Sequence, residues 1–201
     1  MTYSYDVADG HGLPHDPFKA ILAPRPIGWI STVDAEGRPN LAPYSFFNGV
    51  AGSPPMLMFS SEGWKHSVAN AEATREFVCN FASLALKDAM NASSAPVAEG
   101  VNEFELAGLA TAPCRHVRAP RVAAAPAALE CRVVGVTELS DLNGAALNRW
   151  LVIGQVVAVH IDEACLTDGL FDLAKAQPLA RCGYQDYAAV TEVFALARPT
   201  A

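Results

Sequence analysis

Two long β-type segments constrain the fold of this chain more than any other feature. Residues 129–136 and 150–161 mix Val, Ile and Leu with a polar residue at every second or third position. This pattern is typical of barrel strands that bury one face. Asp141-Leu142-Asn143-Gly144 lies between them and supplies turn residues. We therefore expect two long strands connected through a turn.

Shorter strands and helices precede them. The run from 27 to 33 is β-branched and aromatic, and a Gly-containing turn separates it from a second apolar run, which predicts a β-hairpin. Pro54-Pro55 suits the entry of a third strand. The predicted strands of this half are 27–33, 41–47, 56–59 and 77–81, with helices over 65–75 and 84–90, a loop over 91–96, a further helical turn within 103–109 and a connector over 119–128.

The order of strands, helical crossover and strands predicts a mainly β fold, a β-barrel with helices, rather than a doubly wound sheet. No GxGxxG or GxxxxGKS motif is present, so neither a Rossmann dinucleotide site nor a P-loop is supported. With 201 residues, 51% of them hydrophobic, we expect one domain over residues 1–201.

Charge and hydropathy exclude several partners. A net charge of -7 argues against nucleic acid or an anionic membrane surface, because phosphates select clustered Lys and Arg. The first residues show neither a basic nor an apolar targeting region, and the longest apolar run, 151–159, is well short of the ~20 residues that span a bilayer. We expect a cytoplasmic protein without membrane association.

The five cysteines predict neither a zinc site nor a disulfide scaffold. They form no CxxC pair and have no histidine at metal-ligand spacing. Cys79 and Cys131 lie in apolar strand-like runs, which favours small core residues, with a redox role as the alternative. The full set is Cys79, Cys114, Cys131, Cys165 and Cys182.

Three motifs together resemble the flavin reductase-like, FMN-binding split-barrel family, and its flavoredoxin-like branch in particular. They are Ala23-Pro24-Arg25-Pro26-Ile27-Gly28-Trp29-Ile30-Ser31-Thr32, Asn40-Leu41-Ala42-Pro43-Tyr44-Ser45-Phe46-Phe47-Asn48 and Lys65-His66-Ser67-Val68-Ala69-Asn70. The stretches 76–80, 91–96 and 152–157 extend the likeness. The resemblance implies a split barrel, FMN held non-covalently at the interface of a homodimer, and NADH or NADPH as the reductant.

A candidate phosphate site lies where the third strand meets the first long helix. Free backbone N–H groups and the helix dipole favour an anion there, and Lys65 adds a positive charge. The alternative is a serine helix cap beside a solvated lysine. Asn70, about one turn further on, either reaches the ligand or faces solvent. The other candidates are Ser60, Ser61, His66 and Ser67.

Candidates for the flavin ring lie around Pro43. We expect this proline to prevent ordinary strand pairing and so to free backbone groups for a flat heterocycle, the alternative being an edge strand. The resemblance implies that Ala42, Tyr44 and Ser45 lie along the isoalloxazine ring. Ser31 and Thr32 match family positions near the flavin, and a purely structural role in the strand is the alternative. For Asn48, the alternatives are a hydrogen bond from its amide to a flavin carbonyl and a role in closing the turn.

Arg25 is presented from a stiff backbone because prolines flank it. Its guanidinium suits a phosphate or the negative charge of reduced flavin, and a structural salt bridge is the alternative. Arg181 and Tyr184 lie in a C-terminal stretch that resembles the family's closing motif. For His160, the alternatives are a role in acid-base chemistry and a strand histidine that is hydrogen-bonded to a neighbour. No side chain is predicted to be catalytic.

The leading functional hypothesis is an NAD(P)H:flavin oxidoreductase that supplies reduced flavin or electrons to a partner monooxygenase or other acceptor protein. A flavoredoxin-type electron carrier with tightly bound FMN is the alternative, and a structural or regulatory flavin-binding module is a third. A pyridoxamine phosphate oxidase-like barrel would require a more basic phosphate site than Lys65 and Arg25 provide. A homodimer is expected because an isolated barrel leaves an apolar flank open.

Overall fold

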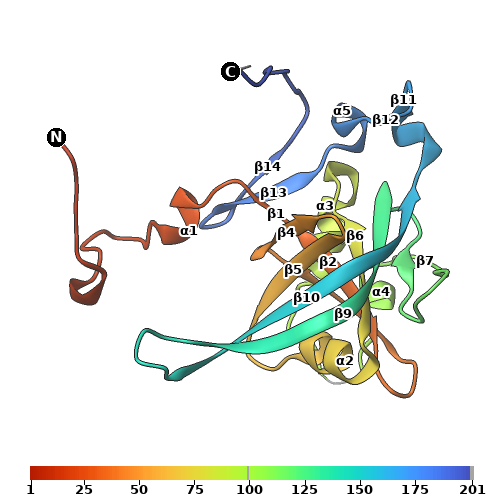
Figure 1. Ribbon diagram of the computed structural model, residues 1–201, viewed down its shortest axis with the longest axis horizontal. Coiled ribbons are helices and arrows are strands. Elements are labelled where there is room, and N and C mark those ends of the chain that lie inside the picture. The colour runs from red at the N-terminus through yellow and green to blue at the C-terminus, as the bar shows by residue number, and fades with distance from the viewer. Residues whose placement is uncertain (99, 200–201) are drawn as a thin grey trace.

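A seven-stranded antiparallel sheet forms the body of the molecule (Figure 1), in the order β3-β2-β6-β9-β10-β5-β4. The computed structural model describes residues 1–98 and 100–199, so the last two residues of the predicted domain lie outside it. The strands of this sheet are β2 (Gly28–Val33), β3 (Pro39–Tyr44), β4 (Phe47–Gly52), β5 (Pro55–Glu62), β6 (Glu76–Phe81), β9 (Ala127–Ser140) and β10 (Ala146–Ile161).

The long strands β9 and β10 confirm the expectation from the alternating pattern. They pair antiparallel along most of their length, with Val156 opposite Cys131, and three register shifts bend the ladder. β2 and β3 form the predicted hairpin. The sequence therefore located the central strands because their side chains alternate between a buried and a less buried face.

Two predictions in the first half were wrong in their boundaries. The run expected as one strand over 41–47 is divided: β3 ends at Tyr44 and β4 begins at Phe47. β4 contains two glycines and is largely exposed, so it has no alternating pattern to detect. β5 continues to Glu62, beyond the predicted end at 59, because its last residues pair with β10.

The helices are short apart from α2 (His66–Thr74), which lies within one residue of the prediction at each end. Val68 and Ala71 are fully buried and pack this helix on the sheet. The predicted helix over 84–90 is a 3-10 turn, η2 (Leu84–Leu86), followed by α3 (Lys87–Ala92). α3 includes Asn91 and Ala92, which were expected in a loop.

A small second sheet joins the two ends of the chain in the order β1-β13-β14. β1 (Arg25–Pro26) pairs with β13 (Leu179–Gly183), so that Arg25 lies opposite Arg181, and β14 is Asp186–Ala189. The remaining elements are η1 (Val7–Asp9), α1 (Phe18–Ile21), α4 (Glu103–Leu106), β7 (Thr111–Ala112), β8 (Arg121–Val122), η3 (Glu163–Cys165), β11 (Leu166–Thr167), β12 (Leu170–Phe171) and α5 (Leu173–Ala176). β8 lies within the predicted connector.

The main core contains a row of three aromatic rings. Phe77 packs edge-on to Phe59 with 5.4 Å between ring centroids, and Phe59 packs on Tyr44 at 4.8 Å. Phe59 and Phe77 are fully buried. A second cluster gathers around Trp29, Leu41 and Phe104 on the other side of β2 and β3. The aromatic row connects the centre of the sheet to Tyr44, a candidate site residue.

Three segments extend away from the body in Figure 1: the N-terminal residues, the end of the β9–β10 hairpin and the C-terminal residues. Their exposed apolar side chains include Tyr3, Phe18, Ile21, Leu142, Val193 and Phe194. Within 1–98 and 100–199, no helix has the length and apolarity needed to cross a membrane. All five cysteines are free thiols.

Candidate functional site

The outer edge of β3 is the backbone feature on which the site is built. The Leu41 N–H donates to Glu103 Oε2 at 3.0 Å, so it points away from β2. Because successive N–H groups alternate between the two sides of a strand, Pro39 and Pro43 face the same open side, where they have no N–H. The expectation that Pro43 prevents ordinary pairing was wrong, since Pro43 lies in register with Trp29. The alternative, an edge strand, is confirmed.

The carbonyl groups of Pro39, Leu41 and Pro43 therefore point outward, and the proline nitrogens add no competing donors. An edge of this kind is complementary to a ligand that carries N–H or O–H donors along one side. Pro43, at this edge of β3, lines two neighbouring cavities.

The first cavity, which we call the α2 cavity, measures about 460 Å³ and lies at the start of α2. Lys65 occupies the N-cap position of that helix, and no side chain of the described residues caps it. The first backbone N–H groups and the Lys65 ammonium thus provide positive potential for an anion. The residues lining it are Asn40, Ala42, Pro43, Tyr44, Trp64, Lys65, His66, Ser67, Ser93, Ser94, Ala95, Pro96, Val97 and Glu103.

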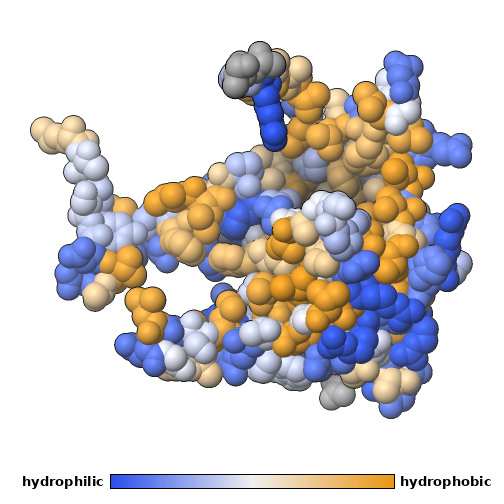
Figure 2. Space-filling model, viewed as in Figure 1, coloured by the Kyte–Doolittle hydropathy of each residue, from blue (hydrophilic) through white to orange (hydrophobic). Residues whose placement is uncertain are grey.

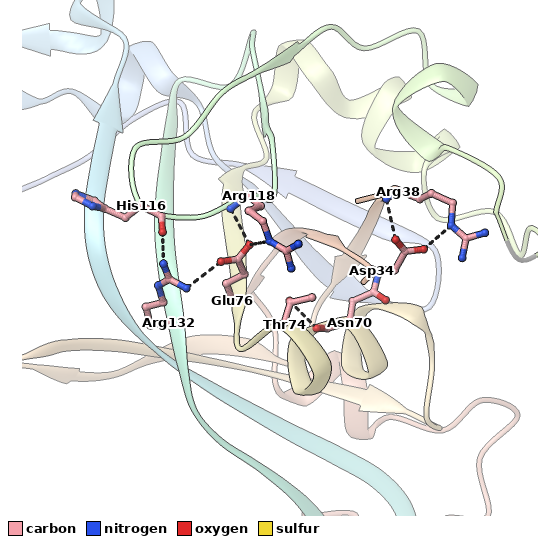
Figure 3. Close-up of polar contacts among 8 residues, drawn as sticks. All are labelled: Asp34, Arg38, Asn70, Thr74, Glu76, His116, Arg118 and Arg132. Carbon is pink, nitrogen blue, oxygen red and sulfur yellow. Dashed lines mark hydrogen bonds and ion pairs between the residues drawn. The ribbon is translucent and has the colours of Figure 1, made fainter. Parts of the chain in front are cut away.

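A hydrogen-bonded layer supports the wall of the α2 cavity. Asn40 Nδ2 donates to Ser67 Oγ at 2.9 Å and to Thr32 Oγ1 at 3.4 Å, and Asn70 Nδ2 donates to Thr32 Oγ1 at 3.1 Å. The Asn70 carbonyl accepts from Thr74 Oγ1 at 2.7 Å (Figure 3). Thr32 and Asn70 therefore hold the lining residues Asn40 and Ser67 in place.

Tyr44 contributes its hydroxyl to the same layer. Burial raises the pKa of Tyr44, while hydrogen bonds to Ser67 and Ser61 act in the opposite direction. The phenol is therefore protonated at neutral pH and able to donate a hydrogen bond. Ser61 Oγ donates to the Gly63 carbonyl at 3.0 Å. Tyr44 links this polar wall to the aromatic row of the core.

The second cavity, the arginine cavity, measures about 320 Å³ and is lined by Lys19, Arg25, Ile27, Pro43, Ser45, Met90, Ser94, Arg181, Gly183, Tyr184 and Tyr187. Arg25 is only 7% exposed, and one of its Nη atoms donates to the Lys19 carbonyl. Its Nε is buried and finds no hydrogen-bond partner among residues 1–98 and 100–199. A buried guanidinium donor left unpaired is costly, which indicates a place for a ligand acceptor.

Arg181 adds a second cation to this cavity. Its guanidinium lies 4.4 Å from the centre of the Tyr187 ring, and it donates to the Tyr184 carbonyl. Pro43 and Ser94 line both the α2 cavity and the arginine cavity. Met90, Arg181 and Tyr187 also line a third cavity of about 550 Å³, the C-terminal cavity, together with Leu84, Lys87, Asp88, Asn91, Leu179, Gln185, Ala188 and Ala189. Because they share these lining residues, we call the three neighbouring cavities together the groove.

The predicted site residues fall into three groups in the structure. Those that line the groove are Arg25, Ala42, Tyr44, Ser45, Lys65, His66, Ser67 and Arg181. Those that support its wall are Thr32, Ser61 and Asn70. Ser31, Asn48 and Ser60 are not brought to it: Ser31 is bonded to the Pro120 carbonyl and to Asn80, Asn48 is exposed in β4, and Ser60 lies opposite Leu151 in β5.

Sequence reasoning missed several lining residues, of which Glu103 and Trp64 are the clearest. Glu103 is 5% exposed and reaches β3 from α4, whose N-cap Asn102 accepts from the Phe104 N–H at 3.0 Å. That capping residue was the only sequence signal for it. Trp64 packs against Trp150 at 4.4 Å and remains 48% exposed at the cavity. Ser93 holds the lining loop 93–97 through its bond from Trp29 Nε1 at 2.9 Å.

His160 and the buried cysteines do not line the groove. His160 Nε2 lies 2.6 Å from Glu130 Oε1, which agrees with a strand histidine satisfied by a neighbour. Burial raises the pKa of the Cys79 thiol to about 12 and raises that of Cys131 further. Both thiols are therefore protonated at neutral pH and poor nucleophiles, as expected of core residues.

Comparison with known proteins assigns the family. The family model named Flavin reductase like domain matches residues 22–178, and the chain belongs to this family of FMN-binding split barrels. The structure is similar to nitrilotriacetate monooxygenase component B from Bacillus cereus, with a TM-score of 0.88 and 28% identity over 98% of this chain and 99% of that one.

Two further solved structures support the fold. A putative flavin reductase with split barrel domain from Shewanella frigidimarina NCIMB 400 has a TM-score of 0.85 and 22% identity over 99% of this chain and 100% of that chain. The flavoredoxin of Desulfovibrio vulgaris (Miyazaki F) has a TM-score of 0.76 and 25% identity over 87% of this chain and 91% of that chain. The mainly β split-barrel prediction is confirmed.

The groove suits the cofactor of the family. An FMN molecule has a dianionic phosphate at one end and a flat ring with both hydrogen-bond donors and acceptors at the other. The start of α2 with Lys65 suits the phosphate, and the unpaired Arg25 Nε suits a ring or ribityl oxygen. The outward carbonyls of β3 suit donors between these ends. The residues present thus fit FMN.

Proposed function

We propose that this chain is an NAD(P)H-dependent flavin oxidoreductase that binds FMN along the groove. The observation that supports this most directly is the buried Nε of Arg25 in the arginine cavity, which has no partner within the described part of the chain. The groove around it offers an anion site at one end, outward carbonyls along β3 and two guanidinium groups at the other end.

In this proposal, the residues bind and orient the cofactor rather than move protons. Lys65, His66, Ser67 and the first N–H groups of α2 hold the phosphate. Ala42, Tyr44 and Ser45 position the ring, and Arg25 and Arg181 stabilise negative charge beside it. Bound FMN would supply the hydride-accepting chemistry that the protein's own side chains lack.

The C-terminal cavity provides room for the co-substrate, NADH or NADPH. It shares Met90, Arg181 and Tyr187 with the arginine cavity, so a second molecule there would lie close to the ring. Arg181 gives it a positive charge suited to a dinucleotide, whereas Lys87 is paired with Asp88 at 3.2 Å. We also propose that the reduced flavin or its electrons pass to a partner protein, in line with the name of the B. cereus relative as a monooxygenase component.

We propose a homodimer as the working form. The N-terminal residues, the β9–β10 hairpin and the C-terminal residues extend from the body with exposed apolar side chains. Figure 2 shows apolar side chains on the side of the molecule that β9 and β10 cross. Of the residues in these two strands, Val134, Val157, Val159 and Ile161 are each more than a third exposed. Apolar surface of this extent favours burial against a second copy.

A second candidate function is a flavoredoxin-type electron carrier with tightly bound FMN and no direct use of nicotinamide. The likeness to the D. vulgaris flavoredoxin favours it. We place either activity in the cytoplasm, because five free thiols suit a reducing compartment.

An anaerobic absorbance experiment tests these functions. The purified protein is incubated with FMN, separated from free flavin, and treated first with NADH and then with NADPH. Bleaching of the oxidised flavin band by either nucleotide supports the reductase and identifies its co-substrate. Bound flavin that only dithionite bleaches supports a carrier or a non-catalytic flavin-binding module, and failure to bind FMN contradicts all of these functions.

A further inference from the structure

Three side chains with different ligand chemistry meet outside the groove. Cys114 lies between β7 and β8, Glu130 in β9 and His160 in β10, and one ligand atom from each lies within 4.8 Å of the other two. Glu130 is in register with Ala158, so His160, two residues further along β10, projects from the same face. The fold thus unites residues whose spacing in the sequence gave no metal motif.

The carboxylate of Glu130 is held in a fixed orientation. It is fully buried, and its two oxygens accept from the Arg115 N–H at 2.7 Å and the His116 N–H at 2.6 Å. Ligating carboxylates in metal sites are usually oriented by outer hydrogen bonds of this kind. Since Cys114 directly precedes these donors, the same loop also positions the thiol.

Two arginines in the same region pair with a different carboxylate, that of Glu76. Glu76 pairs with Arg132 at 3.0 Å and with Arg118 at 3.5 Å, and Arg132 also donates to the His116 carbonyl (Figure 3). These two arginines are therefore engaged by Glu76 rather than by Glu130.

Without a metal, the Cys114 thiol is protonated, and the nearby cation Arg121 favours its thiolate form. Burial and the Glu130 carboxylate raise the pKa of Cys114 to about 11, and Arg121 acts in the opposite direction. The Nε of Arg121 is buried without a partner among the described residues. A metal-bound thiolate would place a negative charge beside this unpaired donor.

We propose that Cys114, Glu130 and His160 form a binding site for a thiophilic divalent transition metal such as Zn²⁺, with the fourth position open to water. Tetrahedral ligands at ~2.0–2.3 Å from the ion lie roughly 3.3–3.7 Å from one another. The observed atoms therefore need to move by about an ångström, and the 2.6 Å bond between His160 and Glu130 opens. The half-buried Cys114 and the 18% exposed His160 side chain leave access for the ion.

Binding involves no change of oxidation state. The thiol proton of Cys114 passes to solvent, and the proton on His160 Nε2 moves to Nδ1 or to solvent, so that sulfur and nitrogen each offer a lone pair.

Cobalt(II) titration of chelator-treated protein tests the site, because Co²⁺ reports its ligands by absorbance. We expect one Co²⁺ per chain, a thiolate-to-cobalt charge-transfer band in the near ultraviolet, tetrahedral d–d bands, and displacement by Zn²⁺. Cys114→Ser should abolish the charge-transfer band and weaken binding by at least about tenfold. Cys182→Ser, in β13, is the matched control and should bind as the wild type does.

His160→Gln provides a second test, because glutamine can retain a hydrogen bond to Glu130 while removing the imidazole ligand. Circular dichroism confirms that each variant is folded. Absence of the bands in the wild type, their persistence in Cys114→Ser, or unchanged affinity in His160→Gln would overturn the proposal. Flavin binding is not needed for this readout, so its outcome is independent of the proposed reductase function.

Discussion

Replacing Gly154 with alanine should destabilise the protein by driving a methyl group into the aromatic row. A Cβ at this position would lie 2.5 Å from Phe77 Cε1, 2.6 Å from Phe77 Cζ and 3.0 Å from Cys131 Cβ. Carbon atoms in favourable contact are ~3.5–4.0 Å apart, so the ring must retreat by about 1 Å. Phe77 is fully buried and packs edge-on to Phe59, which leaves it no open space.

Overpacking of this kind costs about 1–3 kcal/mol, and the backbone of Gly154 lies outside the left-handed region, so the cost is steric. Urea unfolding of flavin-free protein at fixed concentration measures it. With a slope of about 2 kcal/mol/M, a loss of about 2 kcal/mol lowers the midpoint by about 1 M.

Gly135→Ala is the matched control for Gly154→Ala. Gly135 lies in β9 opposite Ile153, also outside the left-handed region, and an added Cβ meets no atom within 4 Å. Alanine there should be neutral or stabilise by ~0.4–1 kcal/mol through the unfolded state. If Gly154→Ala were as stable as Gly135→Ala, the packing argument would be refuted. Because Phe59 connects Phe77 to Tyr44, we also expect weaker FMN binding in Gly154→Ala alone.

Two further perturbations test the site and the turn. Arg25→Lys keeps the positive charge but removes the Nε donor that has no partner among the described residues. A hydrogen bond to a charged group contributes ~1.5–3 kcal/mol. FMN affinity, measured by fluorescence quenching, should therefore fall roughly 10- to 100-fold. Arg149→Lys, at an exposed position of β10, should bind FMN normally, and equal affinities in the two variants would contradict the assignment of Arg25. In the hairpin turn, hydrogen bonds from the backbone N–H groups of Ala145 and Asn143 lower the pKa of Asp141. The ionised carboxylate therefore stabilises the folded state above the ordinary pKa of 3.8. This stabilisation is lost as the pH falls through the lower pKa of the folded protein. Asp141→Asn should flatten that part of the acid unfolding curve, and an unchanged curve would show that the turn does not prefer the ionised form.

The sequence predicted the parts of the fold that carry local periodicity. β9 and β10 were recognised from their alternation, β2 from its β-branched and aromatic residues, and α2 from its alanine content. β4 was missed because its exposed glycines carry no such signal. The short sheet of β1, β13 and β14 depends on Arg25 meeting Arg181 from opposite ends of the chain, a pairing that no local pattern records.

The candidate site, like the fold, was predicted only where a local motif marks its residues. Motifs located Lys65, Ser67, Arg25 and the β3 residues, all of which line the groove. Glu103 reaches Leu41 only because α4 packs against β3. Ser31 and Thr32 are adjacent in sequence, yet strand alternation turns Ser31 toward Pro120 and Thr32 toward Asn40.

The open edge of β3 also bears on self-association. An unpaired strand edge normally recruits further strands, which leads to aggregation or to dimers built by continuing the sheet. Here two prolines lack the N–H that an incoming strand would use, and Glu103 occupies the Leu41 N–H between them. A foreign strand would therefore meet acceptors only and could not complete a ladder. The same edge that suits a donor-bearing small molecule is closed to strand addition, so the homodimer proposed above cannot form by continuing the sheet at β3.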